Sequence, residues 1–245
     1  MNMFTDIISG IKAAVEREEK FLRSLPQEIV TGPRNCQERT IKMILGHLID
    51  SASNNHQRMV RLQYSVHLLV FPDYRQDNDL WIAIQDYQHA DWENMLQLWR
   101  SFNLHICEVM ASVDKSKLNS YWCDFEGTKV TLEEMINGYL DHLNLHIREI
   151  HSLAEGRDIS VCGADCGNCT YLPQCKGCNG CKGAVFYCEG KECPIHSCVK
   201  SKSLKNCIHC SLYPCALYLN MRDPKMSEKE FEESLAKRKE NMTIY

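Results

Sequence analysis

Twelve of the fifteen cysteines lie between residues 162 and 215, in four groups of three with short spacings. Cysteine thiolates two or three residues apart can turn onto one metal ion, and glycines between them permit the tight backbone turn. CGADCGNC and CKGCNGCKG have both features. We therefore predict that all twelve are metal ligands: Cys162, Cys166, Cys169, Cys175, Cys178, Cys181, Cys188, Cys193, Cys198, Cys207, Cys210 and Cys215.

The spacing favours zinc at these cysteines. Twelve thiolates fill three four-cysteine sites, with His196 and His209 as replacement ligands, but the spacing leaves open which cysteines share an ion. The first three cysteines are spaced like radical SAM cluster ligands, yet too few residues follow for that domain. The next three begin like a ferredoxin, but the fourth cysteine is misplaced. An iron–sulfur cluster is therefore the second interpretation, and disulfides, which are rare in a reducing cytosol, the third.

A second set of potential ligands is a histidine pair, His142 and His146, spaced one helical turn apart. Both lie on one face of a predicted helix, His146 within its apolar stripe and His142 at the edge. They should point into the protein interior, where an unpaired imidazole is costly. The pattern suits a first-row metal ion, but it also fits two interior histidines that hydrogen-bond to neighbours.

Four long helices must position these histidines. Apolar residues recur at helical spacing over residues 4–24, 40–64, 91–113 and 131–154. Asp91 is a predicted N-cap, and Thr131 with Glu134 forms a capping box. Pro26 and the Gly32–Pro33 pair interrupt the chain, residues 66–78 form a crossover, and residues 79–87 a short helix. The pattern predicts a mainly α fold, a four-helix bundle with one long crossover.

The cysteines divide the chain into two predicted domains. Residues 1–157 form the bundle, and residues 158–245 form a small irregular domain held together by metal, followed by a terminal helix. Ser227 and Glu230 cap that helix, which should reach about Met242. The cysteine-rich segment has too few apolar residues to fold without its metal.

Two resemblances extend this interpretation. The segments IKMILGHLIDSASNNHQRMVR, DWENMLQLWRSFNLH and GYLDHLNLHIREI resemble the DinB-like superfamily. The resemblance implies a four-helix bundle whose metal is bound by His47, His142 and His146, with zinc, nickel or iron as the ion. Three neutral ligands leave a coordination position open. The cysteine segment resembles a small cysteine-rich domain of unknown function that shares its opening CG-x-x-C-x-x-C and closing C-x-x-C-x-x-x-PC.

The DinB-like resemblance implies a metal-dependent S-transferase that binds a low-molecular-weight thiol and a small electrophile. Two other functions stay open: a non-enzymatic protein-binding module, and a redox or metal sensor using the cysteines. Asn103 and Arg58 are the candidate catalytic residues. Asn103 faces the site or satisfies a backbone group, and Arg58 holds an anionic substrate or forms an ion pair. Asp50, one turn after His47, either orients a metal ligand through a hydrogen bond or is an exposed carboxylate; we favour the exposed carboxylate.

Charge and hydropathy limit the classes of molecule that this protein is expected to bind. The net charge is −4, and metal-bound thiolates would add negative charge to the cysteine segment, so we do not expect nucleic-acid binding. No apolar run is long enough for a membrane span, and no signal pattern is evident, so we expect a cytoplasmic protein. A protein partner and a dimer are compatible with the sequence. We expect His105 to be exposed and assign no role to the isolated Cys36, Cys107 and Cys123, nor to His56, His67, His89 and His151.

Overall fold

A computed structural model divides the chain into two compact units. The first comprises Met1–Thr31 with Thr40–Ile147, and the second Gly32–Arg39 with Arg148–Tyr245. The structure describes residues 3–32, 34–35, 38–65, 77–123, 127–167, 169, 177–180, 191–222 and 226–244. Within these ranges no helix is both long and apolar enough to cross a membrane.

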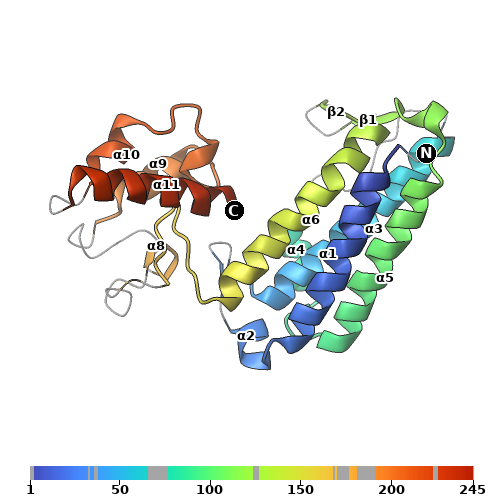
Figure 1. Cartoon of the computed structure of the whole chain (residues 1–245), viewed down its shortest axis with the longest axis horizontal. Helices are drawn as coiled ribbons and strands as arrows, with labels where there is room; N and C mark the ends of the chain where they lie inside the picture. The colour runs from blue at the N-terminus through green and yellow to red at the C-terminus, as the bar shows by residue number, and fades with distance from the viewer. Residues whose placement is uncertain are drawn as a thin grey trace. The chain divides into compact units, whose positions relative to one another are not determined.

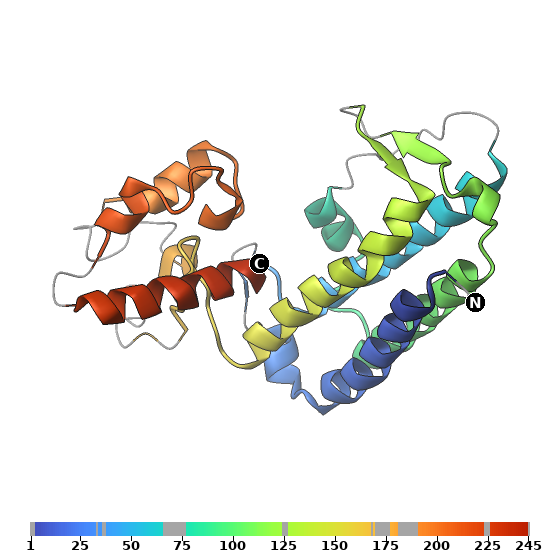
Figure 2. The ribbon, with the colours of Figure 1, turned by 45° about the horizontal axis from the view of Figure 1, so that its top comes forward.

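Four long helices form the first unit, as predicted. They are α1 (Thr5–Ser24), α3 (Ile41–Tyr64), α5 (Trp92–Ala111) and α6 (Leu132–Ala154), and they lie side by side (Figures 1 and 2). The shorter elements are α2 (Gln27–Thr31), α4 (Asn78–Ile84), the 3₁₀ turn η1 (Lys115–Lys117) and the strands β1 (Tyr121–Cys123) and β2 (Lys129–Thr131). The mainly helical fold class is therefore confirmed.

Side-chain caps account for the helix starts. The Asp91 side chain accepts a hydrogen bond from the Asn94 amide, as predicted, and the Thr40 side chain, for which no cap was predicted, accepts one from the Met43 amide. Thr131 Oγ1 accepts from the Glu134 amide while the Glu134 carboxylate accepts from the Thr131 amide, as a capping box requires.

Two short elements differ from the expectation. The break after Pro26 encloses the one-turn helix α2, because the Pro26 carbonyl accepts hydrogen bonds from Ile29 and Val30. Strands β1 and β2 pair antiparallel with Trp122 opposite Val130, although the sequence predicted helices alone in this unit.

Side-chain contacts define the direction of the helices. α1 and α5 run antiparallel, because Arg23 pairs with Glu93 at one end and the Cys107 thiol approaches the Ile8 carbonyl at 3.9 Å towards the other. α3 and α5 run parallel, since Gln63 near the end of α3 accepts a hydrogen bond from the Asp114 amide just beyond α5. The connection between them therefore returns along the bundle, and it contains residues 66–76, which lie outside the described part.

The bundle core is apolar and tightly packed. Its fully buried side chains include Ile11, Leu22, Ile41, Ile44, Leu45, Met59, Leu96, Trp99, Ile106, Met110 and Leu132. Gly46 on α3 lets the Tyr87 ring pack directly against the helix backbone, where a β-carbon would overlap it. Burial of this area is the main stabilising contribution, at about 25 cal/mol per Å² of apolar surface.

The second unit has a small core rich in cysteine. It contains the end of α6 and the elements α8 (Gly177–Gly180), α9 (Pro194–Ser201), the 3₁₀ turn η3 (Cys207–His209), α10 (Ala216–Asn220) and α11 (Glu228–Ile244). The buried cluster consists of Cys178, Cys193, Ile195, Val199, Cys207, Tyr218 and Met242. Ser227 and Glu230 cap α11 reciprocally, as predicted.

Candidate metal centre

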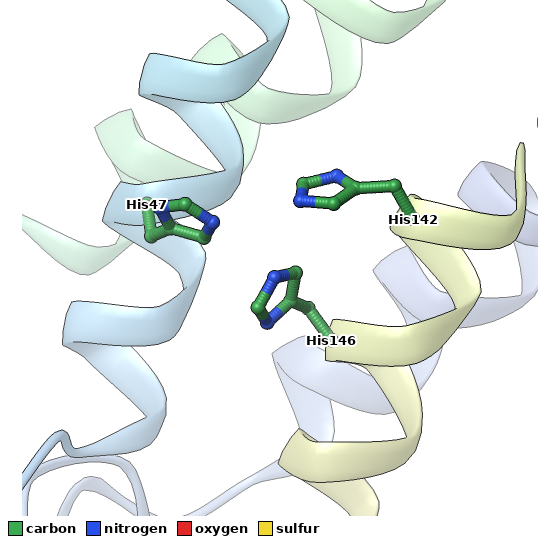
Figure 3. A group of neighbouring side chains, drawn as sticks. All are labelled: His47, His142 and His146. Carbon is green, nitrogen blue, oxygen red and sulfur yellow. The ribbon is translucent and has the colours of Figure 1, made fainter. Parts of the chain in front are cut away.

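Three histidines from two helices converge inside the bundle. His47 lies on α3, and His142 and His146 lie one turn apart on α6; their rings face one another (Figure 3). One nitrogen from each ring lies within 4.8 Å of the others. Throughout the described residues, no other group of three or more His, Cys, Asp or Glu side chains brings its potential ligand atoms this close.

The helices explain why the rings meet. Residues four apart on α6 project from one face, so both of its histidines reach towards α3. His47 and His146 are buried, and His142 is half-buried. Ser51, one turn after His47, places its hydroxyl 3.5 Å from His142 Nδ1, at the outer limit of a hydrogen bond. The structure thus brings together the three residues that the resemblance selected; ligation of a metal by them is still a prediction.

The donor set fits a divalent first-row ion. Zinc–nitrogen bonds of about 2.0–2.1 Å in a tetrahedral site place two ligand nitrogens about 3.4 Å apart. The nitrogens here are within 4.8 Å, so small side-chain rotations close the remaining distance. Neutral imidazoles suit zinc, nickel and iron alike, and the three rings do not by themselves select the metal.

A polar cleft opens at the histidines. Its volume is about 460 Å³, and both His47 and His142 line it. The other lining residues are Ser51, Asn54, Asn55, Arg58, Asn78, Trp122, Val130, Glu134, Met135, Gly138 and Tyr139. A small molecule that enters this cleft would reach the two ligand candidates directly, because their side chains form part of its wall.

Arg58 supplies a positive charge to the wall of the cleft. Its guanidinium carbon lies 4.5 Å from the centroid of the Trp122 ring, and both residues line the cleft. The indole nitrogen of Trp122 in turn donates to the Met135 sulfur at 2.9 Å, which fixes the ring. The structure thus places Arg58 at the cleft, and its role there is still a prediction.

Asn103 takes the structural role of the two considered. It is fully buried, donates to the Trp99 carbonyl at 2.8 Å and accepts from the Tyr139 hydroxyl at 2.9 Å. It is absent from the cleft lining, whereas Tyr139 is part of it. Tyr139 was missed as a site residue because it belongs to the apolar stripe of α6; its place one turn before His142 was the available signal. Burial raises the pKa of its phenol.

Asp50 is buried, which corrects the expectation of an exposed carboxylate. Its side chain accepts hydrogen bonds from Gln85 and from the Tyr87 hydroxyl, both at 2.8 Å. Burial raises the pKa of this carboxyl group, and the two hydrogen bonds partly oppose the shift. These partners follow α4 in the chain, so the sequence around Asp50 could not reveal them.

A second histidine pair lies away from this centre. His105 is exposed, as expected, and its ring centroid lies 5.0 Å from that of His56. The pKa of His56 is lowered first by burial and then by the neighbouring His105. The histidines of this pair are not among the lining residues of the cleft.

Among the residues that the structure describes, no disulfide is formed by Cys107, Cys123, Cys162, Cys166, Cys169, Cys178, Cys193, Cys198, Cys207, Cys210 or Cys215. Cys36, Cys175, Cys181 and Cys188, like His67, lie outside the described residues. Burial, with Asp158 and Cys162 nearby, raises the pKa of Cys166 to about 12. Burial and four surrounding thiols raise that of Cys207 to about 12. Metal ligation by the cysteines remains a prediction.

Comparison with known proteins bears on the bundle alone. No protein-family profile matches the sequence, and no curated protein matches it either. A solved structure that matches is YfiT from Bacillus subtilis, described as a probable metal-dependent hydrolase with an unusual four-helix bundle topology. The TM-score is 0.55 at 18% identity, over 62% of this chain and 86% of YfiT. At this identity the likeness supports the four-helix bundle fold alone.

Proposed function

We propose that the first unit is a metal-dependent enzyme in which His47, His142 and His146 hold one divalent ion beside the cleft. The observation that carries this proposal is the convergence of three histidine nitrogens within 4.8 Å where a cleft of about 460 Å³ begins. Structural zinc sites have four protein ligands, whereas catalytic sites have three and keep a place for water or substrate. The donor count therefore supports catalysis over a purely structural ion.

The ion would act as a Lewis acid that lowers the pKa of a thiol or of water, and so produce a nucleophile near neutral pH. The protein's own residues position the reactants. Arg58, held over Trp122, would bind an anionic group of the substrate, and Asn54 and Asn55 offer amide groups along the same wall. Tyr139, whose hydroxyl donates to Asn103, lines the same cleft as His142.

We favour a low-molecular-weight thiol as the nucleophile, following the DinB-like resemblance. Its sulfur would form a bond to the electrophilic atom of a small second substrate, the leaving group would depart with the bonding electron pair, and the thiol proton would pass to solvent. Biological thiols that carry carboxylates would match the positive charge of Arg58. The polar lining of the cleft suits such a ligand better than an apolar one.

Hydrolysis is the second candidate, because the structural neighbour YfiT is described as a probable metal-dependent hydrolase. In that reaction water replaces the thiol at the same site. A non-enzymatic binding module would need no cleft beside the histidines, so the cleft disfavours it. For the second unit we propose a structural zinc module whose ions stabilise its fold.

One set of assays separates the candidates. The full chain, loaded in turn with zinc, nickel and ferrous iron, is tested for conjugation of carboxylate-bearing thiols to a haloaromatic and for hydrolysis of activated esters and amides. We expect a metal-dependent conjugation rate that is greatest relative to the uncatalysed rate below the free thiol's pKa of about 8.5.

The matched variants test the site itself. His47→Ala should remove the metal-dependent rate, whereas His105→Ala, on the exposed surface, should retain it. Metal-dependent hydrolysis of esters without conjugation of thiols would favour the hydrolase function over the S-transferase function. No metal-dependent rate with any substrate, in protein that contains the ion, would overturn the enzymatic function for these substrate classes.

A further inference from the structure

Four cysteines of the second unit surround one small cavity. Cys198, Cys207, Cys210 and Cys215 line it together with the apolar side chains of Ile195, Val199 and Tyr218 and four other residues. They come from different parts of the local chain: Cys198 from α9, Cys207 from the start of η3, Cys210 from its end, and Cys215 from the residue before α10.

The backbone explains how two of these thiols reach the same space. Cys207 and Cys210 bracket a single 3₁₀ turn, in which the Cys210 amide donates to the Cys207 carbonyl at 3.1 Å. The next turn is closed by the Tyr213 amide, which donates to the Cys210 carbonyl at 3.0 Å, and it returns the chain towards Cys215. Two cysteines separated by two residues in such a turn are the common half of a structural zinc site.

The size of the cavity suits a single ion. Its volume is about 30 Å³, while one water molecule requires about 10–15 Å³ measured in the same way. A four-thiolate zinc site, with bonds of about 2.3 Å, places its sulfurs about 3.8 Å apart. The cavity is therefore on the scale of one ion. No three of the four sulfurs lie as close together as the histidine nitrogens of the bundle, so rotation of the cysteine side chains would bring them onto the ion.

The surrounding charges suit a bound thiolate. Lys202 directs its ammonium group at the Cys210 sulfur, with a nitrogen–sulfur distance of 3.7 Å. Four thiolates and one divalent ion carry two net negative charges, which an adjacent lysine partly balances. The two histidines considered as replacement ligands, His196 and His209, are not among the residues that line this cavity.

Cys162 is the nearest competitor for this set. Its thiol lies 3.1 Å from the Ser160 hydroxyl, and Cys162 does not line the cavity. Cys162 lies near Cys166 as well as near Cys207. Its absence from the cavity lining is therefore what leaves it out of this set.

We propose that Cys198, Cys207, Cys210 and Cys215 together bind one zinc ion, separate from any ion held by the cysteines nearer to residue 162. The assignment rests on the proposed zinc binding of the second unit and adds the grouping of ligands, which their spacing in the sequence left open. Among the four, Cys207 is buried and the other three are half-buried, so the ion would bridge the interior of the unit to α9 and α10.

The test uses the full chain with its zinc replaced by ¹¹³Cd, so that each metal site gives its own NMR resonance, alongside elemental analysis of the zinc form. Cys210→Ser and Cys215→Ser should each lose one metal equivalent and the same resonance, one with the chemical shift of a four-thiolate site. The double variant Cys210→Ser/Cys215→Ser should lose no more than either single variant, because the two residues share an ion.

Two controls define the contrary outcomes. Cys123→Ser, in the first unit, should keep every resonance, and Cys166→Ser combined with Cys210→Ser should lose two. If Cys210→Ser and Cys215→Ser remove different resonances, the grouping is wrong. If the wild-type protein holds no metal beyond a single ion that His47→Ala removes, the proposed zinc module fails as a whole, which is a different result.

A measurement on the wild-type chain covers the case in which a variant does not fold. Increasing chelator is followed by brief alkylation and mass spectrometry of the cysteine peptides. The four cysteines should become reactive together as one zinc equivalent leaves, although their exposures differ. Alkylation of Cys210 or Cys215 while the zinc content is unchanged would overturn the assignment. Lys202→Ala should keep the stoichiometry and weaken zinc retention by about tenfold.

Discussion

His47 and His146 meet across the bundle with their ring centroids 4.6 Å apart, although one belongs to the second long helix and the other to the last. His142 completes the triangle, with centroids 4.8 Å from His146 and 5.7 Å from His47. A divalent ion between them would join α3 to α6 in the middle of the fold. Metal binding should therefore stabilise the bundle as well as prepare it for chemistry, by an amount set by the metal's affinity.

Removing one of these histidines should abolish the bundle site. His146→Ala leaves two imidazoles, which hold a divalent ion poorly, so the full chain should contain one metal equivalent fewer than wild type. The cysteine-bound metal should be unchanged, and His105→Ala should show the full complement because its side chain is exposed. Elemental analysis after gel filtration measures this. Wild-type metal content in His146→Ala would rule out the assignment of this ligand.

Substitutions of the buried Asp50 should distinguish the effect of its charge on stability from the effect of its hydrogen bonds. Its folded pKa is raised above the ordinary value of 3.8, so its contribution to stability is present below that value and is lost as the pH rises through the folded pKa. Asp50→Asn keeps an acceptor for Tyr87 and Gln85 but removes the charge. Its stability relative to wild type should therefore increase from acidic to neutral pH.

The control for that comparison is Asp50→Ala, which removes the acceptor altogether. It should cost about 1–3 kcal/mol, because the buried Tyr87 hydroxyl loses a hydrogen-bond partner. Urea unfolding of both variants between acidic and neutral pH provides the measurement. A constant difference between Asp50→Asn and wild type over that range would contradict the raised pKa.

Local signals in the sequence identified the helices but not every contact between them. The capping box of Thr131 and Glu134 is encoded within four residues, and the structure contains it as predicted. The pair His142 and His146 likewise follows from helical spacing. His47 lies at the border of its apolar stripe, so its inclusion depended on the family resemblance, and only the packed helices place its ring beside the other two.

The features that the sequence did not predict depend on contacts between residues far apart in the chain. Asp50 was expected to be exposed because its partners, Gln85 and Tyr87, follow a different helix and carry no pattern that points to it. The grouping of Cys198 with Cys215 was similarly open, since any combination of four thiols satisfies the same spacing rules. These features depend on how the chain folds back on itself, which neither propensity nor periodicity encodes.

Two helix glycines should respond in opposite ways to alanine. A β-carbon at Gly46 would overlap the Tyr87 ring, which cannot move without disturbing its hydrogen bond to Asp50, so Gly46→Ala should destabilise the protein by about 1–3 kcal/mol. At Gly138 nothing lies within 4 Å of the added carbon, so Gly138→Ala should stabilise α6 by about 0.5–1 kcal/mol. Thermal melts report both; equal effects at the two positions would refute the packing argument.

His56 should make stability depend on pH. Its folded pKa is lowered from the ordinary 6.5, first by burial and then by His105, so the unfolded chain takes up the proton first as the pH falls. The contribution of His56 is therefore complete above pH 6.5 and is lost as the pH falls through the folded pKa.

Proton NMR of the imidazole should show the lowered pKa directly, and His105→Ala should raise it towards the ordinary value. In melts between about pH 5 and pH 8, His56→Gln should lose less stability on acidification than wild type at the same metal loading. Parallel curves for the two proteins would show that His56 does not titrate in this way.

Chelation should act on the two units in different ways. The bundle is held by an apolar core that includes Trp99, Leu45 and Ile106, so loss of one ion from the histidines should leave its helices folded. In the described part of the second unit, three of the seven residues in the buried cluster are cysteines, and apolar burial in that cluster is correspondingly small. Its metal-binding free energy is therefore a large part of its folding free energy.

A mild chelator should remove the bundle ion with little change in circular dichroism. Stripping the cysteine-bound ions should instead lower the helical signal by the share of α9, α10 and α11 and expose the amides of these helices to hydrogen exchange. Loss of the whole helical signal under the mild chelator would show instead that the histidine ion is required for the bundle to fold.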